Sequence, residues 1–540
     1  MPSPAVLHWF RRDLRLTDNR ALNEAIRVAK KTKSPLIPLY ILDPNLIPQN
    51  CSAVRMRFLR ESVSQLRSSL LKHGLNLRVV RGQATQVIPD LAGRWRVRDT
   101  FWESEYDPVS RERDAQVARD LKGSGVNVRT FPGFLLYDPD DVLRHCNGLA
   151  PRTMTGMLKL VEILGDPRTP DSFANGELVE FEEDPFLYED RAQGMCDIPS
   201  LADLGYQDPE NRWDVFEGGE KAGLKRLHRF VKQKNGRIVA DFAKPKTNPA
   251  AFSHRETTVL SPYLALGCVS CRVFHERLRE VEQRYALQEM PQTTLWGQLI
   301  WREHFWLLAY SVKNFHQMRG NVVCRQINWR ADKQSEELLR TWAEARTGFP
   351  WIDALMTQLH KEGFIHHLGR HSLACFLTRG DLWISWERGF KVFEKYLIDY
   401  DYALNSANWM WLSCSAFFVM YYRVYSPVTY GKKWDKDGNF IRHYLPVLRT
   451  MPSKYIYEPW KAPKELQRRV GCIIGKDYPE PIVDHRTASQ CNIARMKESF
   501  EKGEFGKLED ETESRVIASA NNSIITSDDV REPYRKRRRR

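Results

Sequence analysis

The residues best suited to acid–base chemistry lie in one apolar stretch, EGFIHHLGRHSLACFLT, at positions 362–378. It holds three histidines, His366, His367 and His371, together with Arg370. On a helix, His367 and His371 share one face because they are four positions apart, and Arg370 lies about 100° from that face. Imidazoles that titrate near neutral pH can transfer protons, although hydrogen-bonded histidines at the edge of a core would give the same pattern.

A second polar cluster follows in DYDYALNSANWMWL, residues 399–412. Asp399 and Asp401 are two positions apart, and Asn405 and Asn408 stand among apolar and aromatic neighbours. Buried without partners, these groups would cost free energy. A polar ligand, or an arginine such as Arg370, would supply the partners.

Two further segments could bind anions or bases. In TTVLSPYL (257–264) the hydroxyls precede an expected helix start, where they either cap the helix or contribute to a phosphate site. In QLIWRE (298–303), Trp301 and Arg302 could stack on a base and neutralise a phosphate, although an amphipathic core helix would look similar. Four tryptophans, which core packing alone would explain, also stand out: Trp329, Trp383, Trp386 and Trp409.

The chain of 540 residues is too long for one core and predicts at least two domains. No window of 18 apolar residues predicts a membrane span, and the N-terminal residues lack the apolar core of a secretion signal. The ten cysteines are scattered, and Cys268 and Cys271 form a CxxC pair without a second pair. Reduced thiols in a reducing compartment therefore fit better than a zinc site, and no metal site is expected.

The net charge is +14, of which the last six residues, RKRRRR, contribute +6. A basic body favours a polyanionic partner, usually nucleic acid. The basic tail follows a polar stretch at 521–529 and is expected to be disordered. It is typical of a nuclear-import signal or a nucleic-acid-binding patch, which predicts a nuclear protein, with an organelle or the cytoplasm as the alternatives.

The first part of the chain alternates strands and helices. Short buried strands are expected at 5–9, 35–42, 76–81 and 126–130, with a clear helix at 55–73 between two of them. This alternation predicts a parallel α/β sheet. It is a Rossmann-like domain without the GxGxxG fingerprint, and GxxxxGK[ST] is also absent from the chain.

The second part is almost entirely helical. An α/β domain over 1–140 is expected to be joined by a long, partly irregular connector (141–220) to an all-α domain over 221–500, with the basic tail at 501–540. The all-α domain is large enough for a deep pocket between helices. Its expected helices cover 221–233, 270–284, 293–310, 335–346, 351–359, 362–378, 384–397 and 402–420.

Together these motifs resemble the photolyase/cryptochrome flavoproteins, and most of all the eukaryotic (6-4) photolyases. The resemblance extends over about residues 5–500. It rests on WFRRDLRLTDN (9–19), TTVLSPYLALG (257–267), GQLIWREHF (297–305), RTGFPWIDALM (346–356), HHLGRH (366–371), RGDLWISWERG (379–389) and DYDYALNSANWMWL.

This resemblance implies a bound FAD, active as FADH⁻, in the helical domain. Arg370 would pair with Asp399 beside the flavin, and Asn405 would face flavin N5. The remaining cofactor-binding positions implied by the resemblance are Thr257, Thr258, Leu260, Ser261, Gln298, Arg302 and Asp401.

The resemblance further implies blue-light-driven repair of (6-4) pyrimidine–pyrimidone photoproducts. Excited FADH⁻ would pass an electron to a lesion flipped out of double-stranded DNA, and a histidine would act as proton donor. His367 is expected to be that acid, His371 to orient it and His366 to be structural. The expected lesion contacts are Lys244, Gln298, Trp301 and Tyr425.

The four tryptophans match the electron-transfer chain of the family, in the order Trp409, Trp386, Trp329 and Trp383 from the flavin outward. An antenna chromophore is not specified, because ESEYDPVSRERD (103–114) does not clearly reproduce the Asn–Glu pair of pterin-binding relatives. A deazaflavin, methenyltetrahydrofolate or no antenna remain the alternatives.

The alternative function is that of an animal-type cryptochrome, a photoreceptor that signals through clock or transcription proteins. Such cryptochromes also carry the histidine motif, and one chain could have both functions. The loop RVYSPVTYGKK (423–433) and the short tail favour repair. The family suggests a monomer, and the missing Rossmann fingerprint disfavours a generic FAD oxidoreductase.

Overall fold

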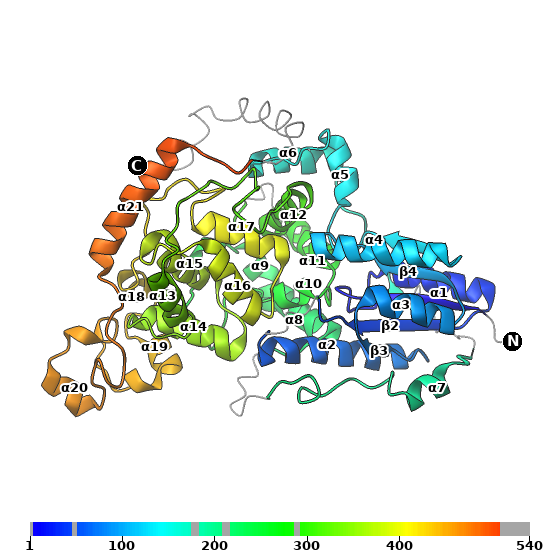
Figure 1. Ribbon diagram of the computed structural model, residues 1–540, viewed down its shortest axis with the longest axis horizontal. Coiled ribbons are helices and arrows are strands. Elements are labelled where there is room, and N and C mark those ends of the chain that lie inside the picture. Colours follow the sequence, from blue (N-terminus) through cyan, green and yellow to red (C-terminus); the bar gives the residue numbers. More distant parts are fainter. Residues whose placement is uncertain (1–3, 46–50, 174–182, 208–215, 286–291, 508–540) are drawn as a thin grey trace.

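The computed structural model describes residues 4–45, 51–173, 183–207, 216–285 and 292–507. The basic tail and the polar stretch before it lie outside the described residues. In the part of the chain that is described, no helix combines the length and apolar character needed to cross a bilayer. Figure 1 shows two halves, an α/β half and a larger helical half.

The α/β half is built on a parallel five-stranded sheet with the strand order β3-β2-β1-β4-β5. The sequence predicts four of these strands but misses β4, where Arg98 and Asp99 interrupt the apolar pattern. Every side chain of β1 is buried, as expected for a parallel sheet covered on both faces. The strands are β1 (Ala5–Phe10), β2 (Leu36–Leu42), β3 (Arg78–Arg81), β4 (Val97–Glu103) and β5 (Asn127–Phe131).

Four helices connect the strands and cover the sheet (Figure 1). Side-chain caps fix three of their starts: Asn19, Ser52 and Asp107 accept hydrogen bonds from the backbone N–H groups of the first turn. These helices are α1 (Arg20–Thr32), α2 (Ala53–Leu71), α3 (Ala84–Arg94) and α4 (Pro108–Gly123).

The expected connector is partly helical, with α5 (Pro139–His145), α6 (Met154–Leu164) and α7 (Leu187–Ala192). Its segment around α7 is anchored to the edge of the sheet. Arg78 of β3, fully buried, donates to Asp184 and Asp190, and the Val79 N–H donates to the Met195 carbonyl. The connector thus covers an otherwise open sheet edge.

The helical half confirms the predicted all-α organisation. Its α-helices are α8 (Glu220–Lys232), α9 (Arg237–Ala240), α10 (Ser261–Ala265), α11 (Cys271–Arg284), α12 (Leu295–Ser311), α13 (Lys333–Ala343), α14 (Pro350–Glu362), α15 (His367–Cys375), α16 (Trp386–Tyr396), α17 (Tyr402–Leu412), α18 (Thr429–Trp434), α19 (Asn439–Tyr444), α20 (Lys464–Val470) and α21 (His485–Lys502). Short 3-10 turns are η2 (Gln233–Gly236), η3 (Lys244–Lys246), η5 (Pro446–Leu448) and η6 (Pro459–Lys461), and η4 (Phe376–Gly380) is a π-helical turn.

Two predicted helices are wrong in extent. The stretch 362–378 contains a break, because α14 ends at Gly363 in the left-handed region and α15 begins only at His367, with His366 as its N-cap. The helix predicted over 402–420 ends at Leu412, because Cys414 and Phe417 have φ of 59° and 64°. A long irregular loop therefore follows α17.

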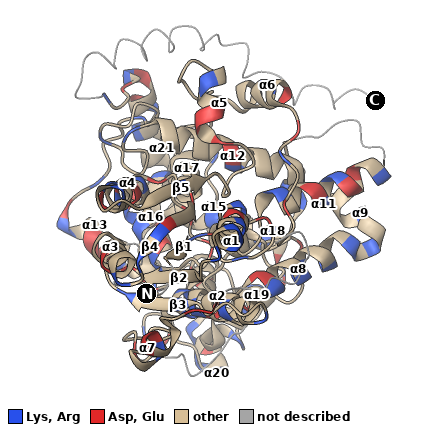
Figure 2. Cartoon of the chain, turned by 90° about the vertical axis from the view of Figure 1, so that its right-hand side faces the viewer, with Lys and Arg blue, Asp and Glu red and all other residues tan. Residues whose placement is uncertain are grey.

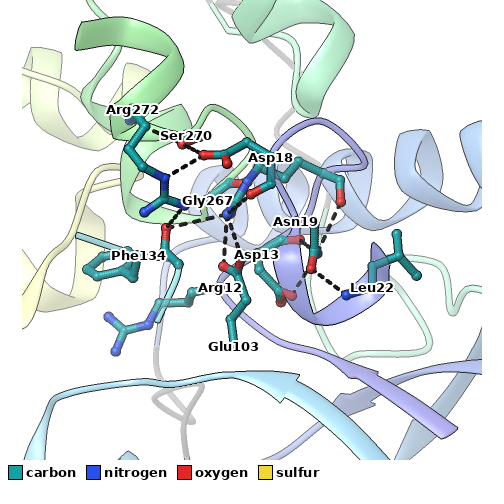
Figure 3. Close-up of polar contacts among 12 residues, drawn as sticks. Arg12, Asp13, Asp18, Asn19, Leu22, Glu103, Phe134, Gly267, Ser270 and Arg272 are labelled. Carbon is teal, nitrogen blue, oxygen red and sulfur yellow. Dashed lines mark hydrogen bonds and ion pairs between the residues drawn. The ribbon is translucent and has the colours of Figure 1, made fainter. Parts of the chain in front are cut away.

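The two halves are joined by a buried ionic cluster (Figure 3). Arg272 of α11 donates to Asp18, with Nε and Oδ2 2.8 Å apart, and Ser270 donates to the same carboxylate. Arg15 donates to Glu103 at 2.8 Å, and burial raises the pKa of Glu103 to about 7 despite that arginine. Separating the two halves, or removing one partner of such a pair, would leave a charge without its counter-charge. The cluster therefore fixes the two halves relative to one another.

Basic residues recur along α8, which carries blue segments in Figure 2. Lys221, Lys225, Arg229 and Lys232 are exposed, whereas the carboxylate of Glu220 is buried and accepts from backbone N–H groups of residues 16 and 17. The helix therefore presents positive charge to solvent, in line with the polyanionic partner expected from the net charge.

Candidate active site

The predicted histidine pair lies together at the start of α15. The rings of His367 and His371 are 5.9 Å apart between centroids and nearly perpendicular. His371 Nδ1 lies 3.3 Å from the hydroxyl of Tyr425, which comes from the loop after α17. Both histidines are partly exposed. The structure thus groups two imidazoles and a phenol, three groups able to exchange protons.

His366 is engaged differently from its neighbours. Its Nδ1 accepts from the Leu368 N–H at 3.2 Å, as the N-cap of α15, and its Nε2 is 2.9 Å from Thr247 Oγ1. Both ring nitrogens are therefore used inside the fold. This supports the expectation that His366 is structural.

Cations surround the histidines. Burial, and then repulsion from Arg370 and Lys244, lowers the pKa of His366 to about 3; burial and Lys244 lower that of His371 to about 3. The same two causes lower the pKa of His367. Burial, followed by Arg370, lowers the pKa of Lys244 to about 8. The histidines are thus neutral at pH 7 beside the cations Lys244 and Arg370, an arrangement that suits an anionic ligand.

Arg370 forms the predicted pair with Asp399. Its Nη2 donates to Asp399 Oδ2 at 2.7 Å, and Ser261 Oγ donates to the same oxygen at 2.7 Å. The other carboxylate oxygen, Oδ1, is buried without a hydrogen-bond partner among the described residues. A buried acceptor left free in this way fits a ligand with an N–H or O–H donor, as the flavin expected here would supply.

The segment Thr257–Ser261 approaches this pair in a strained conformation. Val259, a β-branched residue and 2% exposed, has a φ of 51°, which is a genuine outlier for that residue type. Thr258 Oγ1 accepts from the Leu260 N–H at 3.4 Å. Backbone strain of this kind persists where the surrounding structure demands a particular presentation, consistent with the cofactor-binding role expected for Thr257, Thr258, Leu260 and Ser261.

Two other expected cofactor residues have their polar atoms occupied. Arg302 donates to the Phe134 carbonyl at 2.9 Å and to Glu303 at 3.2 Å. Asp401 accepts from the Leu404 N–H and from Trp306 Nε1, both at 2.9 Å. To bind a cofactor, the Arg302 guanidinium or the Asp401 carboxylate would have to form a hydrogen bond in addition to those it already makes within the fold.

Two of the remaining expected contact residues also donate hydrogen bonds to backbone carbonyls. Asn405 Nδ2 donates to the Phe390 carbonyl at 3.2 Å, and Gln298 Nε2 donates to the Gln292 carbonyl at 2.8 Å. Trp301 packs edge-on against Trp411 with centroids 5.3 Å apart. Gln298 and Trp301 are both partly exposed, as ligand contacts must be.

All four predicted electron-transfer tryptophans are buried. The rings of Trp329 and Trp383 are 4.8 Å apart, and the Arg330 N–H donates to the Trp383 carbonyl. Trp409 packs against α16 so closely that a Cβ placed on Gly389 would lie 2.2 Å from its ring. The indole N–H groups of Trp329, Trp386 and Trp409 have no hydrogen-bond partner among the described residues. Apolar packing thus holds these rings.

Comparison with known proteins identifies the family. The model "DNA photolyase" matches residues 6–172, and "FAD binding domain of DNA photolyase" matches residues 295–498. A (6-4) DNA photolyase of Arabidopsis thaliana is 41% identical over 519 residues, covering 94% of this chain and 90% of the relative. The chain belongs to the photolyase/cryptochrome family.

Both branches of the photolyase/cryptochrome family are similarly close. Cryptochrome-2 of Gallus gallus is 42% identical over 497 residues, covering 92% of this chain and 83% of the relative. The solved structure of a Synechocystis cryptochrome superposes with a TM-score of 0.78 at 26% identity, covering 92% of this chain and 99% of that one. The match to the FAD-binding domain supports FAD as the cofactor.

A cavity of about 300 Å³ lies at the carboxyl edge of the sheet between the two halves. Its lining includes Arg12, Tyr40, Arg55 and Tyr400. The available sequence signal for this cavity was the RRD that follows β1, since Arg11 and Arg12 of that motif line it. Within 103–114, the carboxylate of Glu105 pairs with Arg12 at 3.1 Å, so it is not free to bind a pterin as the Asn–Glu pair would.

Proposed function

We propose that this chain repairs (6-4) pyrimidine–pyrimidone photoproducts in DNA, driven by blue light. The observation that carries the proposal is the placement of His367 and His371 on the helix that also holds Arg370 against Asp399. The helix α15 thereby brings two proton-transfer groups close to the ion pair that is expected to lie beside the flavin.

Reduced FAD, when bound and excited, supplies the electron that the lesion needs. The chain supplies the proton: His367 is the acid, and His371, held by Tyr425, fixes its orientation. Both imidazoles are neutral in the cationic pocket described above. The phosphates of DNA and FAD oppose the charges of Lys244 and Arg370, which moves the pKa of His367 upward and allows it to take up a proton.

Lys244, Gln298, Trp301 and Tyr425 are the lesion contacts in this proposal. A flipped base needs stacking and hydrogen-bonding partners, and these four side chains are all partly exposed. The basic face of α8 contributes attraction for the duplex. The enzyme acts as a monomer on double-stranded DNA, and the RKRRRR tail directs it to the nucleus.

The second candidate function is that of a cryptochrome which signals through clock or transcription proteins. The specific observation in its favour is the identity of 42% to cryptochromes, against 41% to (6-4) photolyases. The antenna is a separate question. The cavity at the sheet edge has room for a second chromophore, and absorption spectra of the extracted chromophores would distinguish a deazaflavin, methenyltetrahydrofolate and none.

The test is blue-light illumination of the reduced holoprotein on two oligonucleotides, one with a single (6-4) photoproduct and one with a cyclobutane dimer. Restoration of only the (6-4) lesion is expected. Restoration of only the dimer would contradict the lesion assignment, and restoration of neither would leave the signalling function as the better account.

A further inference from the structure

Arg379 lies in the π-helical turn that ends α15, and it is 1% exposed. Its Nε donates to the Leu412 carbonyl at 2.9 Å, and its Nη1 donates to the carbonyls of Tyr421 and Arg423 at 2.8 and 3.0 Å. Within the described residues, no carboxylate forms an ion pair with it, and its Nη2 has no partner. Besides these carbonyls, the side chain interacts with the thiol of Cys414. A buried guanidinium without a carboxylate partner is costly, which argues for a specific role.

The three carbonyls belong to the end of α17 and to the irregular loop after it. Backbone hydrogen bonds within this loop are local, such as Phe418 N–H to the Ala416 carbonyl and Arg423 N–H to the Met420 carbonyl. Val419 and Tyr422 are 51% and 57% exposed. Arg379 therefore ties this exposed loop to the segment after α15, beside a bond from the Arg325 N–H to the Ser415 carbonyl and a contact of Cys375 with the Tyr425 backbone.

The same loop carries Tyr425, two residues beyond the last carbonyl that Arg379 holds. Tyr425 contacts His371 Nδ1, and its ring also packs on Tyr430 with centroids 5.0 Å apart. Arg379 lies eight residues after His371, in the turn η4 that follows α15, and Thr378 directly before it has non-helical backbone angles. Arg379 thus binds the loop through the Tyr421 and Arg423 carbonyls, and the same loop contacts His371 through Tyr425.

We propose that Arg379 is a positioning residue for the histidine pair: by clamping residues 412–423 to the end of α15, it holds Tyr425 against His371 and supplies a fixed positive charge behind that imidazole. This inference rests on the proposed function, because it assigns Arg379 a part in proton delivery to the lesion. It predicts that loss of the clamp slows the chemistry more than it weakens lesion binding.

The charge of Arg379 is one of several that act on His371. Burial and then Lys244 and His366 lower the pKa of His371, and Arg379 adds to the same effect. Removing one cation should therefore raise the pKa of His371. The groups that face His371 from the surrounding elements are Lys244 of η3, His366 and His367 of its own helix turn, Arg379, and Tyr425 of the loop.

The test compares Arg379→Gln, Arg379→Lys and a matched control, Arg442→Gln. Arg442 also bridges backbone carbonyls, those of Asp437, Arg449 and Met451, but in a different loop. The measurements on each FAD-loaded protein are flavin content, lesion affinity, single-turnover repair after photochemical reduction, and the ¹⁵N NMR titration of His371, assigned with a His371→Asn difference spectrum.

For Arg379→Gln we expect retained flavin, lesion affinity within about threefold and repair slowed about 10- to 100-fold, with the His371 titration moved to higher pH. Arg379→Lys keeps the positive charge, so its repair rate should lie between those of the wild type and Arg379→Gln. The pKa of His371 should be the same in Arg379→Lys as in the wild type. A repair rate of Arg379→Gln equal to that of the wild type would overturn the proposal. So would a loss of repair rate equal to that of Arg442→Gln, together with an unchanged pKa of His371.

If Arg379→Gln does not fold, Arg379→Lys carries the test alone, and a wild-type repair rate in that variant overturns the positioning role. If the wild-type protein repaired neither the (6-4) photoproduct nor the cyclobutane dimer, the proposed function itself would be contradicted. The NMR titration is independent of repair, so a shift of His371 in Arg379→Gln would still support the electrostatic and positional link.

Discussion

Arg370 and Asp399 form a partly buried ion pair, 2.7 Å between Nη2 and Oδ2, in which the carboxylate keeps one oxygen free of partners. Arg370 lies on α15 and Asp399 in the turn before α17, so the pair joins the helix of the histidines to the segment that carries Asn405. This buried oxygen without a partner is the strongest evidence in the structure for a ligand that donates a hydrogen bond to Asp399.

Asp399→Asn should weaken FAD binding. The amide cannot keep a charge-assisted bond to Arg370, so we expect the FAD dissociation constant to rise about 10- to 100-fold. Flavin retention after dialysis and titration of the apoprotein with FAD measure this. Glu336→Gln, which breaks the exposed pair with Arg388, is the control and should leave retention unchanged. Equal flavin retention in the two variants would rule out the role of Asp399.

Sequence spacing predicted the local arrangement of the candidate site residues but not the long-range contacts that hold them. Residue type and spacing placed His367, His371 and Arg370 on one helix, because helical periodicity is a local property. The break before His367 depends on Gly363 adopting a left-handed conformation and on Thr247, 119 residues away, bonding to the capping His366. Such a long-range contact has no local signature.

Long-range contacts also explain the other differences. Strand β4 was missed because Arg98 and Asp99 break its apolar pattern, yet pairing with β1 and β5 places it inside the sheet. Arg379 was noticed only as part of a motif. The available signal was a lone arginine in the apolar run ACFLTRGDLW, whose three carbonyl partners lie 33 to 44 residues away.

Lys244→Met should reduce affinity for damaged DNA more than turnover. Lys244 is partly buried and close enough to the three histidines to lower their pKa values, whereas Lys246, two residues away, is exposed, so Lys246→Met is the matched control. Loss of one phosphate contact should lower the slope of log affinity against log salt by about 1. Because the pKa of Lys244 is lowered to about 8, wild-type affinity should fall between pH 7 and 9, and the fall should be smaller in Lys244→Met. An unchanged salt slope and pH dependence would place Lys244 outside the DNA contact.

The stability of the apoprotein should fall in mild acid. The pKa of His371 is lowered to about 3 by burial and Lys244, from an ordinary value near 6.5, so the unfolded chain binds its proton first. The stabilisation is present above pH 6.5 and is lost as the pH falls toward 3, by up to about 1.4 kcal/mol per pH unit. Urea denaturation of wild type and His371→Asn from pH 8 to 5 tests this, and parallel curves would contradict it.

Trp386→Phe should block photoreduction of oxidised FAD while leaving repair by pre-reduced enzyme intact. Trp386 is fully buried and its indole N–H has no partner among the described residues, so phenylalanine loses no hydrogen bond. Trp342 is an apt control, because it is equally buried, equally unpartnered and 6.4 Å from Trp409 between ring centroids. Absorption at 450 nm under blue light should bleach in Trp342→Phe and persist in Trp386→Phe. Normal bleaching in both variants would mean that Trp386 only packs the core.

His366→Ala and His367→Ala should separate structure from chemistry at adjacent positions. His366 caps α15, so its loss should cost about 1 kcal/mol of unfolding free energy, with repair retained by the folded enzyme; His366→Asn, which can also cap, should restore most of that stability. His367 makes no capping contact, and His367→Ala should keep FAD and lesion binding but lose repair, as general acids contribute about 10²- to 10⁴-fold. Denaturation midpoints and single-turnover repair measure the two effects. Normal repair by His367→Ala would show that another group, with His371 the nearest, delivers the proton.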